Sequence, residues 1–222
     1  MVVTGLGAIT PVGPDMRSTW NAVLRSDNDN ANNSSKDVAH DGITSLEKAL
    51  KLQNLSPEQY KKESSYLQSL SCKVAASVNT DWIINHPNKP NGGHSHWNDG
   101  RTSRFVQLAL IAAEEAMIHS GLDTWLGNTE QDEPSTIDAS TLQQRRESFG
   151  VSIGNGMSST RDISMASATL SDQPDARKAH RKISPHFVPQ ILPNSPSARV
   201  AIHNKLLGPN LSHSEACAAG AW

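Results

Sequence analysis

The clearest helical pattern in this chain lies between residues 105 and 116. Apolar and alanine residues recur there at every third or fourth position, on one face of a helix: Phe105, Leu108, Ala109, Ala112, Ala113 and Ala116. Ser103 suits the N-cap of this helix, and Gly121 suits its end. Because alanine side chains are small, the pattern predicts close packing of this helix against a sheet or another helix.

The same spacing predicts other, shorter helices. After Pro14 and Asp15 comes a short amphipathic helix, whose apolar face is formed by Met16, Trp20, Val23 and Leu24. Residues 196–207 are suited to a helix with Pro196 in its first turn. A weaker helical pattern covers residues 45–70.

Short runs of β-branched and apolar residues predict strands at 1–4, 72–78, 149–153 and 211–216. The third of these runs straight into Gly154-Asn155-Gly156, where glycines permit another backbone to approach closely. Because the predicted strands alternate with helices, we expect an α/β fold with a largely parallel sheet.

Three segments near residues 27–36, 85–100 and 128–148 are polar and lack apolar periodicity. We interpret them as polar insertions within a domain that extends over residues 1–222.

Composition narrows the class of protein. With 222 residues, of which 36% are hydrophobic, the chain is long enough for a sizeable core concentrated in a few segments. A net charge of −2 excludes a general nucleic-acid binder. No apolar run approaches a membrane span, and no basic stretch precedes a longer apolar one, so we expect a soluble, intracellular protein without a signal peptide.

The two cysteines, Cys72 and Cys217, are far apart and show no C-x-x-C spacing, which argues against a disulfide framework or structural zinc. Cys217 follows a predicted strand and precedes small residues, as in a strand-to-helix turn. The N–H groups at a helix start favour a thiolate, and a thiolate is a nucleophile. Spacing alone still favours a small buried hydrophobe at Cys217, and Cys72, inside an apolar pattern, is expected in the core.

Other candidates leave alternatives open. The opening V-V-T-G-L-G begins like a dinucleotide-binding unit, but Thr10 and Pro11 stand where that fingerprint continues, so a tight turn is the better interpretation. His94 and His96 have metal-ligand spacing without a third ligand, which favours a solvated loop. Met157 suits packing or a pocket lining.

Two arginines, Arg101 and Arg104, precede the alanine-rich helix. They suit either a solvated helix start or a docking patch for an acidic partner.

Five blocks in series carry a resemblance to a known family: V-V-T-G-L-G-A-I-T-P-V-G, R-x-x-R-F-x-Q, G-V-S-I-G-N-G, R-K-I-S-P-H-F-V-P, and L-G-P-N followed by A-C-A-A-G-A. This series resembles the elongating β-ketoacyl-[acyl-carrier-protein] synthases, the condensing enzymes of fatty-acid synthesis. The resemblance implies a thiolase-like fold and a homodimer for the full-length protein. It implies acyl transfer to a cysteine, followed by a decarboxylative Claisen condensation with malonyl-carrier protein.

The resemblance also assigns roles to residues. Cys217 matches the nucleophile, which takes the acyl chain from the phosphopantetheine of acyl carrier protein, and no further cofactor is implied. Met157 matches a position beside the acyl pocket. Arg101 and Arg104 match a basic patch near the surface on which the carrier docks. The implied compartment is the mitochondrion for a eukaryotic source and the cytoplasm otherwise.

This sequence also departs from the family's motifs at several positions. The family's two decarboxylating histidines and a nearby lysine lie well downstream of the nucleophile, whereas this sequence ends five residues after Cys217. We therefore expect the N-terminal half of the thiolase-like fold, truncated just after the nucleophile and inactive alone. Glu215, where the family has a small neutral residue or Thr, opposes thiolate formation. Ser158 and Ser159 replace a usual Gly-Gly.

Two alternatives to a condensing enzyme remain. One is a non-catalytic truncated remnant that binds a carrier protein or a full-length partner. The other is a polyketide-type ketosynthase domain.

Overall fold

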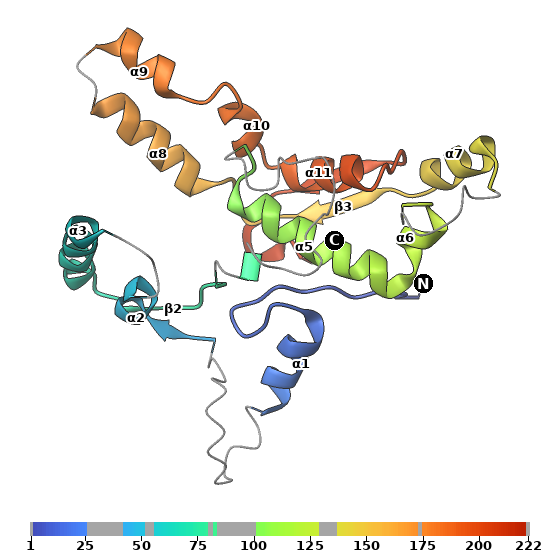
Figure 1. The fold of residues 1–222 in the computed structure, drawn as a ribbon, viewed down its shortest axis with the longest axis horizontal. Helices are drawn as coiled ribbons and strands as arrows, with labels where there is room; N and C mark the ends of the chain where they lie inside the picture. The colour runs from blue at the N-terminus through green and yellow to red at the C-terminus, as the bar shows by residue number, and fades with distance from the viewer. Residues whose placement is uncertain are drawn as a thin grey trace. The chain divides into compact units, whose positions relative to one another are not determined.

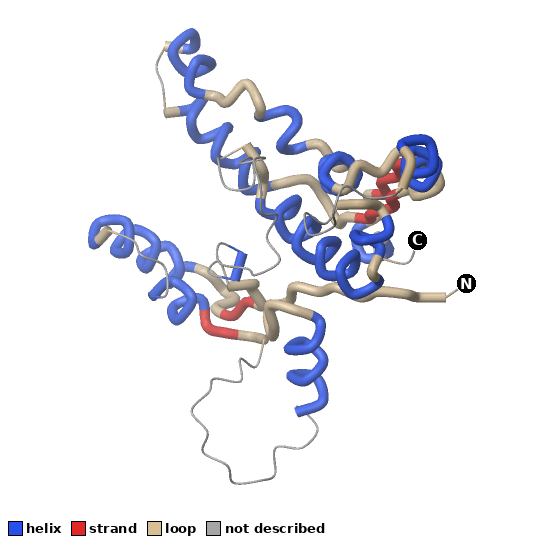
Figure 2. Tube along the Cα trace, turned by 45° about the vertical axis from the view of Figure 1, so that its right-hand side comes forward, coloured by secondary structure: helices blue, strands red, loops and turns tan. Residues whose placement is uncertain are grey.

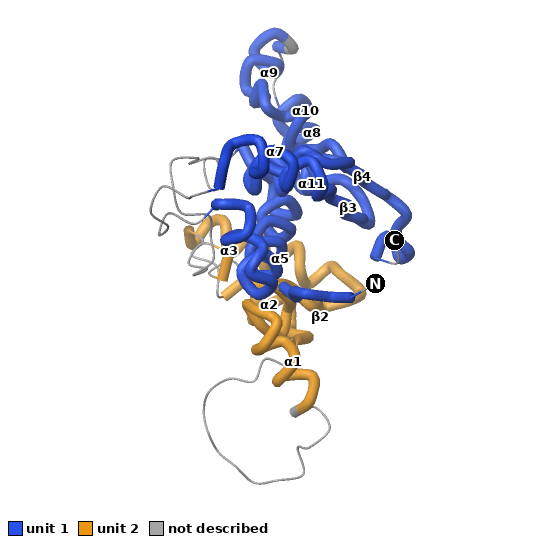
Figure 3. The backbone as a smooth tube through the Cα atoms, turned by 90° about the vertical axis from the view of Figure 1, so that its right-hand side faces the viewer, with its two compact units in different colours: residues 1–7, 87–222 blue, residues 8–86 orange. Residues whose placement is uncertain are grey.

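The computed structural model describes residues 2–25, 42–51, 56–79, 82–83, 101–128, 137–172 and 175–220. The chain divides into a larger unit, residues 1–7 with 87–222, and a smaller unit, residues 8–86 (Figure 3). The insertions expected near 27–36 and 85–100, and residues 129–136 of the third, lie outside the described residues. A single domain over residues 1–222 stays a prediction.

The described part of the smaller unit includes α1 (Met16–Arg25), β1 (Thr44–Ser45), α2 (Leu46–Lys51), α3 (Pro57–Ser69) and β2 (Val74–Ala75). The strands β1 and β2 pair antiparallel. Helix α1 confirms the amphipathic helix predicted after Pro14 and Asp15. Helix α3 begins with a reciprocal capping box, in which the Ser56 hydroxyl accepts from the Gln59 amide and the Gln59 side chain accepts from the Ser56 amide.

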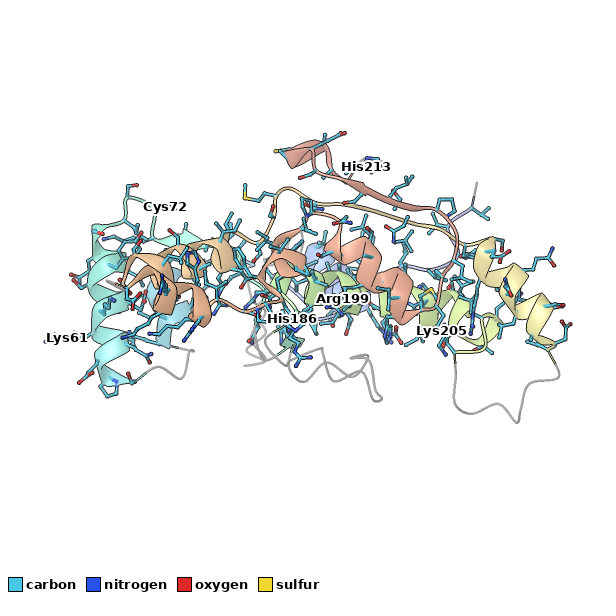
Figure 4. The ribbon with its side chains drawn as sticks, turned by 90° about the horizontal axis from the view of Figure 1, so that it is seen from above. Lys61, Cys72, His186, Arg199, Lys205 and His213 are labelled. Carbon is cyan, nitrogen blue, oxygen red and sulfur yellow. The ribbon has the colours of Figure 1, made fainter. Side chains whose placement is uncertain are left out.

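Two expectations for the smaller unit are wrong. The strand predicted at 72–78 is reduced to Val74–Ala75, and Cys72, expected in the core, is exposed. Its thiol lies 3.5 Å from the Val74 carbonyl oxygen, and Figure 4 labels it just after α3. Because a two-residue strand offers no broad sheet face, the apolar pattern around Cys72 has little to pack against.

The core of the larger unit lies between α5 (Arg104–Ser120), α11 (Ser195–His203) and β3 (Val151–Gly154). Val106, Leu110 and Val200 are buried together, and Phe105, Ala113, Val151 and Ile153 pack against them. Figure 1 shows α5 and α11 beside β3. Helix α5 follows Ser103 and ends at Gly121 in the left-handed conformation, so its predicted bounds are confirmed.

A parallel strand pair lies next to this core. Strand β3 pairs with β4 (Asn210–His213), in a register that runs from Val151 opposite Asn210 to Gly154 opposite His213. The parallel pairing confirms the sheet type expected from the sequence. Strand β4 ends at His213, however, and not at residue 216.

The other helices of the larger unit are short: α6 (Leu122–Trp125), α7 (Ala139–Glu147), α8 (Thr160–Ser171), α9 (Ala176–Lys182), α10 (Phe187–Ile191) and the 3₁₀ turn η2 (Ala216–Ala218). Helices α8 and α9 lie side by side, as Figures 1 and 2 show. Helix α7 falls within the segment 128–148 that was expected to be a polar insertion. It is fixed by Arg145, whose guanidinium donates to the Trp125 carbonyl at 2.8 Å and stacks on the Trp125 ring.

The strand expected at residues 1–4 is absent from the described part of the chain, where residues 2–7 are extended but carry no ladder. This segment instead packs on α5. The Leu6 amide donates to His119 Nδ1 at 3.0 Å, and a Cβ at Gly5 or Gly7 would overlap a backbone carbonyl of α5. The glycines therefore serve close approach to a helix.

Candidate active site

Cys217 lies on a tight turn that follows strand β4. The chain leaves β4 at His213, which Figure 4 labels, and enters the 3₁₀ turn η2 at Ala216. The Ala218 amide donates to the Glu215 carbonyl at 3.0 Å, and the Ala219 amide donates to the Ala216 carbonyl at 3.3 Å. Ala216 has φ +48°, a conformation that residues other than glycine rarely adopt. The predicted strand-to-helix turn is therefore present, with a single 3₁₀ turn as the helix.

Gly154, the last residue of β3, brings this turn against the strand. A Cβ built on Gly154 would overlap the Ala219 carbonyl oxygen, and one built on Gly156 would lie 3.9 Å from the Ala216 oxygen. The close backbone approach expected at Gly154-Asn155-Gly156 is thus made to the turn that bears Cys217.

The Cys217 side chain is exposed, and so is that of Glu215, two residues earlier. The alternative of a small buried hydrophobe at Cys217 is therefore wrong. An exposed thiol at this turn is open to a bulky thioester, while the Glu215 carboxylate places negative charge near it.

Met157 follows Gly156 on the loop beside the Cys217 turn, and 64% of its surface is exposed. Gly154, three residues earlier, packs against the Ala219 backbone of this turn. A pocket lining at Met157 stays a prediction.

The arginine candidates come from another element. Arg101 precedes α5 and is exposed. Arg104 is the first residue of α5 and is half-buried. Burial lowers the pKa of Arg104, and the nearby positive charge of Arg161 lowers it further. Arg161 lies in the first turn of α8, and no motif in the sequence singles it out.

Ser103, the N-cap of α5, makes no capping bond with its side chain. Its buried hydroxyl donates instead to the Gln190 carbonyl at 2.9 Å, which fastens α10 to the start of α5. Arg104 therefore lies where the start of α5 meets α10, and it faces the positive charge of Arg161 on α8.

Sequence reasoning also missed a polar cluster beside the turn. The Pro193 carbonyl accepts hydrogen bonds from Asn155 Nδ2 at 2.7 Å and from Ser212 Oγ at 3.2 Å. The one signal in the sequence is an asparagine between two glycines at a strand end.

The described residues contain neither a metal-binding cluster nor a membrane-spanning helix. Within them, no group of three or more His, Cys, Asp or Glu side chains is placed to hold a metal ion. His94 and His96 lie outside the described residues. No helix in the part of the chain that the structure describes is both long and apolar enough to cross a membrane.

An exposed cysteine on a turn after a parallel strand agrees with the family resemblance, and comparison with known proteins supports it. The profile of the family "Beta-ketoacyl synthase, N-terminal domain" matches residues 1–222. The chain belongs to the β-ketoacyl synthase family.

Among curated relatives, the mitochondrial 3-oxoacyl-[acyl-carrier-protein] synthase of Arabidopsis thaliana is 30% identical over 227 residues, covering 100% of this chain and 39% of the relative. The 3-oxoacyl-[acyl-carrier-protein] synthase homolog of Saccharomyces cerevisiae is 28% identical, covering 99% of this chain and 42% of the relative. The chain thus spans about two fifths of the length of these relatives.

Solved structures support the fold. A β-ketoacyl synthase from Burkholderia phymatum superposes with a TM-score of 0.54 at 16% identity, covering 99% of this chain and 40% of the other. The ishigamide ketosynthase/chain length factor gives a TM-score of 0.52 at 14% identity, with 96% and 39% covered. The expected α/β, thiolase-like fold, represented by its N-terminal part, is confirmed.

Proposed function

We propose that this chain is the N-terminal part of a 3-oxoacyl-[acyl-carrier-protein] synthase of fatty-acid biosynthesis, with Cys217 as the residue that is acylated. The observation that carries this proposal is the exposed Cys217 thiol on the turn after β4, in a chain whose curated relatives bear that name.

The first half-reaction follows from the position of this thiol. The Cys217 sulfur attacks the thioester carbonyl of an acyl chain on the phosphopantetheine arm of the carrier. A new carbon–sulfur bond forms, the bond to the carrier's sulfur breaks, and the carrier thiol leaves with the proton that Cys217 gave up. The backbone N–H of Cys217 lies next to the attacked carbonyl and donates to its developing oxyanion.

The second half-reaction, decarboxylation of a malonyl group and condensation, needs donors that stabilise negative charge. Removal of one such donor typically costs about 3 kcal/mol of transition-state stabilisation. None of the nine histidines of this sequence matches the family's decarboxylating pair. We therefore expect the 222 residues alone to give no 3-oxoacyl product.

The partner is an acyl carrier protein, which brings its own phosphopantetheine, and the enzyme needs no further cofactor. Arg101 and Arg104 form the basic patch on which an acidic carrier docks, and charge complementarity of this kind mainly accelerates encounter. The full-length protein is a homodimer, and in a eukaryotic source it acts in the mitochondrion, as the name of the Arabidopsis relative suggests for that protein.

The acylation step is tested by incubation of the purified chain with acyl-carrier protein carrying a radiolabelled acyl group. We expect a thioester on Cys217, mapped by mass spectrometry, that is absent from Cys217→Ser and retained in Cys72→Ser. Cys72 is the matched control because it is also an exposed thiol. Label on Cys72, or label that persists in Cys217→Ser, would contradict the assignment.

A second candidate is favoured by one observation, the exposed Glu215 carboxylate two residues before Cys217. A protein that binds the carrier without reacting tolerates such a charge more easily than a nucleophile does. Carrier binding that depends on Arg101 and Arg104, with no acyl transfer to Cys217, would support this non-catalytic remnant.

A further inference from the structure

One backbone carbonyl ties together the ends of the two parallel strands. Asn155, the first residue after β3, and Ser212, in β4, both donate to the Pro193 oxygen, at 2.7 Å and 3.2 Å. Pro193 lies in the connection between α10 and α11, just before the Asn194 N-cap. The ends of both strands are therefore hydrogen-bonded to one carbonyl group in the connection between α10 and α11.

Asn155 is also in register with the strand that leads to Cys217. Its backbone amide donates to the His213 carbonyl at 2.8 Å, which continues the β3–β4 pairing by one bond. Its neighbour Gly154 lies against the Ala219 backbone of the Cys217 turn. Asn155 thus directly follows the residue that contacts that turn.

The hydrogen bond fixes how the Asn155 amide is oriented. A carbonyl oxygen can only accept, so the Nδ2 group must face Pro193 and the Oδ1 atom must face away. That Oδ1 atom is buried and has no hydrogen-bond partner among the described groups. Among the described groups, the Nδ2 bond to Pro193 is therefore the hydrogen bond that holds this side chain, and it offsets part of the penalty of the unpartnered Oδ1.

The turn needs such support. Ala216 adopts φ +48° immediately before the cysteine, and a non-glycine residue keeps that conformation only where its surroundings impose it. The close contact at Gly154 fixes one side of the turn, and the strand end at Ser212 and His213 fixes the other.

We propose that Asn155 is a positioning residue for Cys217. Its amide, together with the Ser212 hydroxyl, holds the ends of β3 and β4 on the Pro193 carbonyl and so fixes the turn that presents the thiol. The consequence for acyl transfer rests on the proposed function, whereas the positioning itself is independent of any activity.

The test uses the 222-residue chain with Cys72 replaced by Ser and a nitroxide attached to Cys217. Its electron paramagnetic resonance spectrum reports how freely the turn moves. We expect a motionally restricted label in this parent chain and a rotational correlation time shortened at least about twofold in Asn155→Asp, because that side chain keeps the shape of asparagine but loses the donor.

Matched pairs separate positioning from general stability. Ser212→Thr retains the hydroxyl and should keep the parent spectrum. Ser212→Val has the shape of the threonine variant but no hydroxyl, so it should increase the motion of the label. Asn204→Asp is the distant control, because Asn204 also donates through Nδ2 to a backbone carbonyl, that of Val200. We expect it to leave the label restricted even where it lowers the thermal midpoint.

A freely moving label in the parent chain, an Asn155→Asp spectrum equal to that of the parent, or equal spectra for Ser212→Val and Ser212→Thr would overturn the proposal. If Asn155→Asp fails to fold, the Ser212 pair decides. Because no acyl transfer is measured, failure here leaves the acylation of Cys217 untouched, and failure of acylation leaves this result standing.

Discussion

Gly154 of β3 lies directly against Ala219, the residue that follows η2. A Cβ built on Gly154 would overlap the Ala219 carbonyl oxygen and lie 2.6 Å from its carbonyl carbon, whereas one built on Gly220 would meet nothing within 4 Å. At Gly154 the strand and the turn that bears Cys217 therefore meet through backbone atoms. A side chain at Gly154 cannot avoid this contact by changing its rotamer.

Gly154→Ala should displace the Cys217 turn and destabilise the larger unit. Overpacking of this kind typically costs about 1–3 kcal/mol, and each kcal/mol lowers the thermal midpoint by about 2–4 °C for a chain of this size. Thermal unfolding followed by circular dichroism measures the loss. Gly220→Ala is the matched control and should keep the parent midpoint, so equal midpoints for the two variants would contradict the packing described.

Glu215 should reduce the reactivity of Cys217 toward anionic reagents. Two unit charges a few ångströms apart in water interact by about 1 kcal/mol, which corresponds to a factor of about 5 in rate. We expect Glu215→Gln to raise the ratio of iodoacetate to iodoacetamide alkylation at Cys217 by about 2–5-fold, and less in high salt. Exposed Cys72 supplies the internal control in the same sample, and its ratio should not change.

Elements with a regular local pattern were predictable from the sequence. Helix α5 was expected from its alanine-rich face, Ser103 and Gly121, because these signals are local and consistent. The parallel pairing of β3 and β4 followed from the alternation of strands and helices. The turn at Cys217 could be inferred because a strand is followed by small residues.

Other features depend on partners distant in sequence, which a local pattern does not contain. The segment 2–7 resembles a strand, but its glycines pack on α5. Cys72 lies in an apolar run that forms only a two-residue strand. Asn155 and Ser212 reach the Pro193 carbonyl across 38 and 19 residues of sequence, and every residue possesses a backbone carbonyl, so no residue type in the sequence predicts that site.

Gly7→Ala should release the N-terminal segment from α5. The new Cβ would overlap the Ala112 carbonyl oxygen and lie 2.8 Å from the Ala116 nitrogen, both in the helix backbone. Hydrogen exchange of the Leu6 amide, which donates to His119, should accelerate by about tenfold or more, equivalent to about 1.4 kcal/mol. Val3→Ala is the control because the Val3 side chain is 72% exposed. Unchanged exchange in Gly7→Ala would show that the segment is not held by this contact.

Helix α7 should lose its N-terminal cap in acid. The Ser140 hydroxyl and the hydroxyl and amide of Thr141 donate to the Asp138 carboxylate, and they hold the pKa of Asp138 well below its usual range. A depressed pKa in the folded state contributes stability that is complete above the unfolded-state value of about 3.9 and is lost as pH falls toward the folded value. The ¹³Cα shifts of residues 139–147 should therefore lose helical character below about pH 4, before those of α5 do. Asp138→Asn keeps an acceptor without a titrating proton, so its α7 shifts should follow those of α5. An equal loss in both chains, or flat shifts in the parent chain down to about pH 2, would show that Asp138 does not control this helix.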